Sequence, residues 1–306
     1  MMDEILQGNS IDLLKYFDDN SIHAIISDIP YGIGYEDWDV LHNNTNSAYG
    51  GASNAQIDAG QLFKRRGKPL NGWSEADKKI PFEYQTWCES WANDWFRILK
   101  PGGSCFIFAG RRLAHRCIVA LENSGFTFKD MLSWEKNAAP HRAQHLSAVF
   151  ERRKDLSNAE NWKDWRVANL RPLFEPILWF QKPYKIGGTI ADNVLENGVG
   201  AWNESALRNY IIGDNFDKSS NIIKVHVTAE DHGMHAAQKP LALMKLLIAL
   251  VTKEDQIVLD PFAGSGTTCV AAYHLNRRYI GIEINEEYCE IARSRINNSY
   301  QTKINI

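Results

Sequence analysis

The chain has 306 residues, enough for one large α/β domain with insertions or two modest domains, and its composition (44% hydrophobic, 23% charged) is that of a folded globular protein. Its net charge of −3 excludes a strongly basic nucleic-acid-binding protein, although cations cluster locally at 64–68, 111–116 and 152–154. No apolar run approaches the ~20 residues that cross a bilayer, and the acidic start MMDEILQGNS is unlike a signal peptide, so we expect a cytoplasmic protein without a membrane partner.

Seven short apolar runs, each ended by a polar residue, Gly or Pro, predict buried strands. They lie at 5–8, 22–28, 104–109, 128–134, 176–181, 257–260 and 279–283. Helical patterns separate them, at 82–99, at 111–123, at 241–251 and after an expected N-cap at Asn285. Strands that alternate with helices predict an α/β fold with about seven mostly parallel strands flanked by helices.

The helix predicted at 82–99 carries Trp87, Trp91 and Trp95 at a spacing of four residues, which gives it a wide apolar stripe. We expect that stripe to face the core, with a dimer contact as the alternative. Pro101-Gly-Gly103 should stop the helix.

Three stretches interrupt this alternation. The segments 43–80 and 184–231 are polar and lack periodicity, and loops of this length are usually functional or mobile. The segment 151–170 is charged, carries tryptophan and is expected to be an added helical piece.

The five cysteines predict buried free thiols, because they are odd in number and none lies in a C-x-x-C pair. His232 and His235 have no Cys, Asp or Glu nearby at ligand spacing, so no metal site is predicted.

A glycine-rich loop follows the predicted strand 257–260 and precedes an apolar helix: Asp260-Pro-Phe-Ala-Gly264-Ser-Gly266-Thr-Thr268. Such a turn lets backbone and helix amides approach a ligand closely. The loop lacks the Lys of a phosphate-binding loop and the third Gly of a dinucleotide turn. Glu283 ends the next strand, where an acid can accept hydrogen bonds from ribose hydroxyls. We therefore expect a ligand that contains an adenosine but no tightly cradled phosphate.

A second loop, Ser27-Asp28-Ile29-Pro30-Tyr31-Gly32, follows the predicted strand 22–28. Asp28 and the Ile29 carbonyl can each accept a hydrogen bond from an amino group, while Tyr31 can stack on a planar ring. This combination suits the NH2 of a heteroaromatic base, because holding both protons makes the nitrogen more sp3-like and nucleophilic. Taken alone, D-x-P-Y is a weak signal, and a structural turn is the alternative.

Together the two loops resemble those of the amino-methyltransferases of DNA, the N6-adenine and N4-cytosine family, in which D-P-P-Y or S-P-P-Y is the catalytic motif and F-x-G-x-G the cofactor motif. The segment 238–268 resembles the family's fused cofactor block, and 100–103, 134–136 and 178–182 resemble its intermediate segments. The catalytic loop precedes the cofactor loop, with the variable segment 184–231 between them, which is the order of the family's beta class.

The resemblance implies a Rossmann-like methyltransferase fold that uses S-adenosyl-L-methionine. It divides the chain into a catalytic half at 1–183 with insertions at about 43–80 and 151–170, a target-recognition region at 184–231 and a cofactor-binding half at 232–306.

The resemblance also implies roles for single residues. The catalytic set is Asp28, Ile29, Pro30 and Tyr31. The cofactor set comprises Phe262, Gly264, Ser265, Gly266 and Thr267 along the cofactor, Glu283 at its ribose, Lys239 and Pro240 at its methionine end, Asn9 near its adenine, and Asp28 and Asp260. Two positions depart from the family pattern: Asn9 stands where Asp is frequent, and Ile29 where Pro is usual.

The function that follows is methylation of the amino group of a base flipped out of double-stranded DNA. Asp at position 28 favours adenine N6 over cytosine N4. An RNA or protein amino-methyltransferase is the second alternative, and an NAD-dependent oxidoreductase is an alternative from another class. Sequence reading is expected in 184–231, helped by the two insertions. A homodimer and a cognate restriction endonuclease are the further partners that the resemblance allows.

Overall fold

The computed structural model describes residues 2–31, 75–136, 139, 143–167, 169–212, 220–228, 231 and 238–304. Most of the segment predicted to be irregular at 43–80 lies outside these residues, as do His232 and His235.

Eight strands of the described chain form one sheet in the order β1-β8-β7-β2-β3-β5-β4-β6. They are β1 (Glu4–Gln7), β2 (Ile22–Asp28), β3 (Leu99–Phe108), β4 (Thr127–Glu135), β5 (Phe174–Gln181), β6 (Ile222–Ile223), β7 (Ile257–Asp260) and β8 (Arg278–Glu283). Every neighbouring pair is parallel except β3–β5 and β5–β4, so β5 alone is reversed.

The predicted α/β fold is therefore confirmed, and each of the seven predicted strands is present. The eighth, β6, was missed because two residues carry no periodicity.

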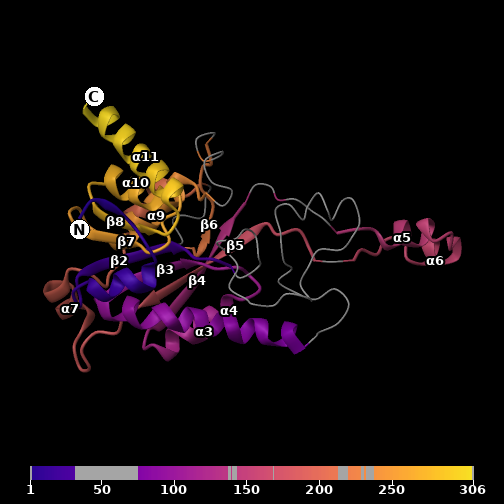
Figure 1. Cartoon of the computed structure of the whole chain (residues 1–306), viewed down its shortest axis with the longest axis horizontal. Helices are drawn as coiled ribbons and strands as arrows, with labels where there is room; N and C mark the ends of the chain where they lie inside the picture. The colour runs from indigo at the N-terminus through magenta and orange to yellow at the C-terminus, as the bar shows by residue number, and fades with distance from the viewer. Residues whose placement is uncertain are drawn as a thin grey trace.

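Helices cover both faces of the sheet (Figure 1). One face carries α3 (Glu75–Ile98) and α4 (Ala114–Asn123), with α1 (Ser10–Leu13) and η1 (Leu14–Tyr16) beside them. The other carries α8 (Glu204–Tyr210), α9 (Leu241–Val251), α10 (Thr267–His274) and α11 (Glu286–Ile304). Alternate residues of β3 enter the two cores, Phe106 and Phe108 on the α9 side and Cys105 and Ile107 on the α3 side. A strand buried on both faces is apolar throughout, which explains why the run was readable in the sequence.

The helix α3 differs from its prediction at both ends. It begins at Glu75, seven residues earlier than predicted, and contains Pro81. It ends at Ile98 because β3 already begins at Leu99, so Pro101-Gly-Gly103 lies within the strand rather than in a turn. The expected core-facing stripe is confirmed, since Trp91 and Trp95 are fully buried.

Two regions expected to be insertions have definite places. The piece predicted at 151–170 contains α6 (Leu156–Asn161) and only the end of α5 (Leu146–Arg152), and both short helices project far from the sheet (Figure 1). In the predicted recognition region, α7 (Ile190–Asn197) lies beside the start of β3, where the Asn193 Nδ2 donates hydrogen bonds to the carbonyls of Pro101 and Val199. The start of β3 lies at the amino ends of the parallel strands, whereas Asp28 lies at the carboxyl end of β2.

All five cysteines are buried free thiols, as expected. Within the described part of the chain, no helix combines the length and the apolar character needed to span a membrane.

Trp91 should contribute heavily to stability because it packs against both Trp95 and Phe262, with ring centroids 4.2 and 6.3 Å away. We expect Trp91→Ala to lower the free energy of unfolding by about 3–5 kcal/mol. The matched control is Trp165→Ala in the turn that follows α6, where the side chain is 61% exposed and the change should stay within about 0.5 kcal/mol. Urea denaturation of both variants measures the difference, and equal losses would contradict this packing.

Candidate active site

The two chemistry-bearing loops meet because β2 and β7 are neighbours. Ala24 pairs with Val258 and Ile25 with Leu259, so the parallel strands end side by side at Asp28 and Asp260. From this point β2 leads to β3 on one side and β7 leads to β8 on the other. Such a switch point opens a crevice at the carboxyl ends of the strands, which is where open α/β sheets bind ligands.

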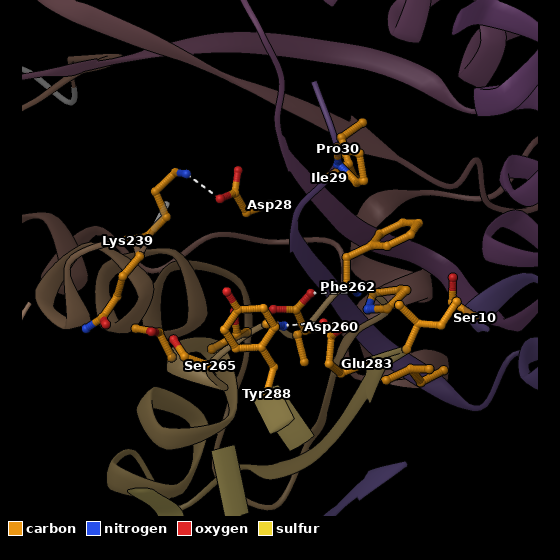
Figure 2. Close-up of a pocket in the computed structure, with 18 of the residues that line it drawn as sticks. Ser10, Asp28, Ile29, Pro30, Lys239, Asp260, Phe262, Ser265, Glu283 and Tyr288 are labelled. Carbon is orange, nitrogen blue, oxygen red and sulfur yellow. Dashed lines mark hydrogen bonds and ion pairs between the residues drawn. The ribbon is translucent and has the colours of Figure 1, made fainter. Parts of the chain in front are cut away.

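A cavity of about 540 Å³ occupies this crevice. Most of the predicted site residues line it, namely Asn9, Asp28, Ile29, Pro30, Tyr31, Lys239, Asp260, Phe262, Gly264, Ser265, Thr267 and Glu283 (Figure 2). Its volume lies within the usual range for sites that enclose a small organic ligand.

Pro240 and Gly266 do not line the cavity. Pro240 precedes α9, where its carbonyl accepts the amide hydrogen bonds of Leu243 and Met244. Gly266 starts α10 with φ +79°, and a Cβ placed there would lie 2.7 Å from the Cβ of Ala292. Both residues therefore shape the loops on which the lining residues stand.

Asp260 organises the glycine-rich loop from within. It is 3% exposed and accepts hydrogen bonds from Ser27 Oγ at 2.7 Å, Thr268 Oγ1 at 2.6 Å and the Phe262 amide at 3.2 Å. Burial raises the pKa of Asp260 to about 6, although these donors oppose the shift. The carboxylate thus ties the end of β2 to the loop after β7.

Glu283 ends β8, the strand next to β7, on the same side of the cavity as Asp260 (Figure 2). One carboxylate oxygen accepts from the Gly264 amide at 2.9 Å and the other from the Asn285 amide at 2.8 Å. Burial raises the pKa of Glu283 despite these bonds. Glu283 thereby fixes the glycine-rich loop and still presents an acid to the cavity.

The third wall comes from the start of α1. The Asn9 Oδ1 caps that helix by accepting the Ile11 amide at 3.0 Å. Its neighbour Ser10 is 3% exposed and lines the cavity, and its Oγ has no hydrogen-bond partner among the described residues. An orphaned buried hydroxyl at a cavity wall fits a polar ligand that would complete its hydrogen bonding.

Asp28, predicted to be catalytic, belongs to a cluster of four charged side chains. The Lys239 ammonium forms a close ion pair with Asp28 (Figure 2) and lies 3.3 Å from Glu175. Glu175 also pairs with Lys136, and the Tyr31 hydroxyl donates to both carboxylates, at 3.0 Å for Asp28. Lys239 and Glu175 are 6% and 8% exposed, so two carboxylates balance two ammonium groups with little help from water.

The pKa values of Asp28 and Glu175 are shifted in opposite directions. Burial raises the pKa of Asp28, and the Lys239 ammonium opposes but does not overcome this. Burial also disfavours ionised Glu175, but Lys239 and Lys136 outweigh it and lower the pKa of Glu175 to about 2. Asp28 is therefore the better proton acceptor of the two.

The Asp28 loop is held from the α3 side as well. The Tyr84 hydroxyl donates to the Pro30 carbonyl at 3.1 Å, and the Ile29 side chain is 1% exposed in the core beneath. The loop is thus fixed by packing even though Ile29 stands where the resembled family usually has Pro.

Glu175 and the role of Lys136 were not predicted from the sequence, whereas Ser10 lies in the stretch 8–10 that resembles the family's segment near the adenine. Glu175 precedes the predicted strand 176–181 in a sheet expected to be mostly parallel, and a parallel strand would have placed it at the end of the sheet opposite Asp28. Because β5 is antiparallel, its first residues instead reach the cavity. The segment 134–136 had been noted only as resembling the family's intermediate motif.

The crevice, its acidic walls and its cavity define an α/β enzyme that binds a nucleoside-like ligand at the switch point of its sheet. Comparison with known proteins identifies the family. The sequence profile of a family described as DNA methylase, N6_N4_Mtase, matches residues 22–294. The chain belongs to this family and is therefore a DNA methyltransferase that depends on S-adenosylmethionine. This membership sets aside the oxidoreductase alternative.

Similar proteins agree with this placement. The type II methyltransferase M.HindIII of Haemophilus influenzae is 65% identical over 307 residues, covering 99% of each chain. Among solved structures, the cytosine-N4-specific PvuII DNA methyltransferase has a TM-score of 0.60 at 16% identity, covering 98% of this chain and 92% of that one. The M1.HpyAVI complex with S-adenosylmethionine has a TM-score of 0.53 at 22% identity, with 96% and 98% covered. At these identities the structures establish the fold alone.

The raised pKa of Asp260 predicts how stability depends on pH. Between an unfolded value of 3.8 and a folded value of about 6, the native state binds the proton more tightly than the unfolded chain does. Stability from this group is therefore lost as the pH rises through that window, by about 3 kcal/mol in all. Asp260→Asn does not titrate at this position. Urea denaturation at several pH values should therefore show the free energy of unfolding of the wild type falling relative to that of the variant between pH 4 and 6. Parallel stability profiles would contradict the assignment.

Proposed function

We propose that the chain methylates the exocyclic amino group of a base flipped out of double-stranded DNA, with adenine N6 as the preferred target. The observation that carries this proposal is the single cavity that joins Asp28 and Tyr31 to the Asp260–Glu283 wall. A stacked base cannot bring its amino group into such a crevice, so the base must leave the duplex. Cytosine N4 is the alternative target, and an RNA or protein amino group is the second.

The lining residues divide between the two ligands. S-adenosylmethionine supplies an electrophilic methyl group bound to its sulfonium sulfur. Glu283 would accept hydrogen bonds from its ribose, Ser10 and Asn9 would stand by its adenine, and Phe262 and Gly264 would lie along its length, since all five line the cavity. Lys239 lies between this wall and Asp28, where its ammonium suits the methionine carboxylate as well as the acids that it pairs with.

The amino group is oriented by the Asp28 loop. The Asp28 carboxylate and the Ile29 carbonyl accept its two protons, while the Tyr31 ring stacks on the base. Nitrogen then attacks the methyl carbon as the carbon–sulfur bond breaks, and the cationic nitrogen must release one proton. Asp28 is suited to receive that proton because burial raises its pKa. Positioning contributes much of the acceleration.

The likeness to a type II methyltransferase supports a place in a restriction-modification pair, with a cognate restriction endonuclease as partner. We place the protein in the cytoplasm, where bacterial DNA lies. A homodimer is the other assembly that we propose from the beta-class motif order, and sedimentation velocity measures it.

The product identifies the target. We would incubate the wild type and Asp28→Ala with S-adenosylmethionine and unmethylated bacterial DNA, digest to nucleosides and analyse them by mass spectrometry. The wild type should yield N6-methyldeoxyadenosine, and Asp28→Ala should lower the rate by about 10²- to 10⁴-fold. Calorimetry should find cofactor binding largely retained in Asp28→Ala, with Asp12→Ala in α1 as an exposed control.

Other outcomes are equally informative. N4-methyldeoxycytidine would overturn the adenine assignment and leave the rest of the mechanism standing. Neither product, with the cofactor bound, would direct the search to RNA or protein substrates. Retained turnover in Asp28→Ala would remove Asp28 from the mechanism.

Glu175 should act as a positioning residue through Asp28 and Tyr31. Glu175→Gln removes a negative charge beside Asp28, so we expect kcat to fall about 10- to 100-fold because the base-holding groups are displaced. The pKa of Asp28 should fall too, moving the acidic limb of the rate profile to lower pH. The exposed Glu135→Gln at the end of β4 is the matched control. An unshifted acidic limb would show that Glu175 is merely structural.

A further inference from the structure

One arginine of α11 supports the glycine-rich loop from behind the cavity wall. The Arg295 Nη1 donates hydrogen bonds to the Ser265 carbonyl at 2.6 Å, to the Ser265 Oγ at 3.0 Å and to the Thr267 Oγ1 at 3.0 Å. Ser265 and Thr267 are 4% and 6% exposed and line the cavity, whereas Arg295 does not line it. Arg295 can therefore act on a bound ligand through the two residues that it holds and through its charge.

The supported stretch of the loop has little stiffness of its own. Ser265 stands between Gly264 and Gly266, whose φ angles are +50° and +79°. Glycine populates this region about as readily as the ordinary one, so neither neighbour restrains the backbone strongly. Glu283 holds the Gly264 amide at 2.9 Å, one residue before Ser265. The hydrogen bonds from Arg295 therefore fix the orientation of the Ser265 side chain and carbonyl.

The distance between α11 and the loop is set by packing. Ala292 lies three residues before Arg295, and residues three apart share one face of a helix. A Cβ placed at Gly266 would lie 2.7 Å from the Cβ of Ala292, so the helix and the loop are in close contact at this face. The helix α11 therefore presents Arg295 to the loop at a fixed distance.

The charge of Arg295 is balanced only in part. Burial lowers the pKa of Arg295, and the Asp231 carboxylate opposes this change. Both oxygens of Asp231 already accept hydrogen bonds, one from the Leu241 amide at 2.7 Å and the other from the Thr228 amide and hydroxyl at 2.7 and 3.0 Å. The acceptors of the Arg295 Nη1 are neutral oxygens, and an arginine keeps its charge even when buried. Positive potential therefore remains at this wall and favours an anionic group on the ligand.

The part of the cofactor that meets this wall follows from the neighbouring residues. Ser265 lies on the Lys239 side of the cavity and Ser10 on the other side, with Glu283 between them (Figure 2). With the adenine at Ser10 and the ribose at Glu283, the amino-acid end of S-adenosylmethionine lies at Ser265. That end carries a carboxylate, which is the anionic group that the charge of Arg295 favours.

We propose that Arg295 is a positioning residue for the amino-acid end of the cofactor. It holds Ser265 and Thr267 in the orientation in which they contact that end, and its charge attracts the carboxylate. Recognition of the adenosine at Ser10 and Glu283 does not depend on it. The inference rests on the proposed function, in the orientation that this function gives the cofactor.

Two ligands that share the thioadenosine and differ at the amino-acid end separate this role from general support of the fold. S-adenosylhomocysteine carries that end, and 5′-deoxy-5′-methylthioadenosine lacks it. Calorimetry should find that Arg295→Gln binds S-adenosylhomocysteine about 10- to 100-fold more weakly than the wild type, because it loses hydrogen bonds from a charged donor. Its affinity for methylthioadenosine should equal that of the wild type.

The conservative variant Arg295→Lys should recover much of this affinity. All three acceptors converge on one nitrogen, and an ammonium group can donate three hydrogen bonds while keeping the charge. Because the lysine side chain is shorter, we expect its affinity for S-adenosylhomocysteine to lie between those of the wild type and Arg295→Gln. In methylation assays, Arg295→Gln should raise the KM for S-adenosylmethionine and leave kcat nearly unchanged.

The matched control is Arg293→Gln. Arg293 lies two residues earlier on α11 and also donates to a backbone carbonyl, that of Ile5 at 2.8 Å, but Ile5 does not line the cavity. This variant should bind both ligands as the wild type does. Urea denaturation of all three variants measures any loss of stability separately from binding.

Equal weakening of both ligands in Arg295→Gln would overturn the proposal, because Arg295 would then support the cavity as a whole. Wild-type affinity of Arg295→Gln for S-adenosylhomocysteine would also overturn it, as would an equal loss in Arg293→Gln. The proposed function fails separately, if the wild type methylates no DNA base, whereas the role of Arg295 is judged by the binding of the two ligands.

Discussion

The ion pair between Lys239 and Asp28 is the interaction on which the site depends. It joins residues 211 positions apart and so connects the loop after β2, predicted to be catalytic, to the segment before α9, predicted to bind the cofactor. Buried charges are costly, and this pair is tolerable only because Glu175, Lys136 and the Tyr31 hydroxyl complete the network. Removing any one member leaves another charge unpaired, so the network specifies one arrangement of the pocket.

The order of the sheet makes that contact geometrically possible. The chain builds β2 near its start and β7 near its end, yet the two strands pair at the centre of the sheet. Asp260 secures the junction, because its carboxylate accepts a hydrogen bond from Ser27 of β2 and another from Thr268 of α10. The loop predicted to be catalytic and the loop predicted to bind the cofactor, far apart in sequence, thus share one buried acid.

The sequence predicted what depends on local pattern. The strands Ile22–Asp28 and Ile257–Asp260 were placed to the residue, because strands buried on both faces are apolar runs that end where the acid begins. The place of Glu175 was not predictable, because the direction of β5 is set by pairing with β3, and no local feature of 174–181 encodes it. Likewise, the Asn9 side chain was expected at the cofactor, and only the position of α1 reveals that its oxygen caps a helix while Ser10 stays unpartnered. Residues that line the site through tertiary contacts were therefore the ones missed.

The pairing between the end of β4 and the start of β5 determines which changes of sequence the neighbouring pocket can tolerate. Glu135 pairs with Phe174 at the end of the β4–β5 ladder, so the register of both strands is fixed before the chain continues into the segment that carries α5 and α6. Insertions or exchanges beyond that point add only loop-closure entropy, about 0.6 kcal/mol for each doubling of length. The segment that carries α5 and α6 can consequently change in length while the pocket beside it keeps its geometry. Changes in that segment therefore need not disturb Lys136 and Glu175, which line the pocket where the segment begins and ends.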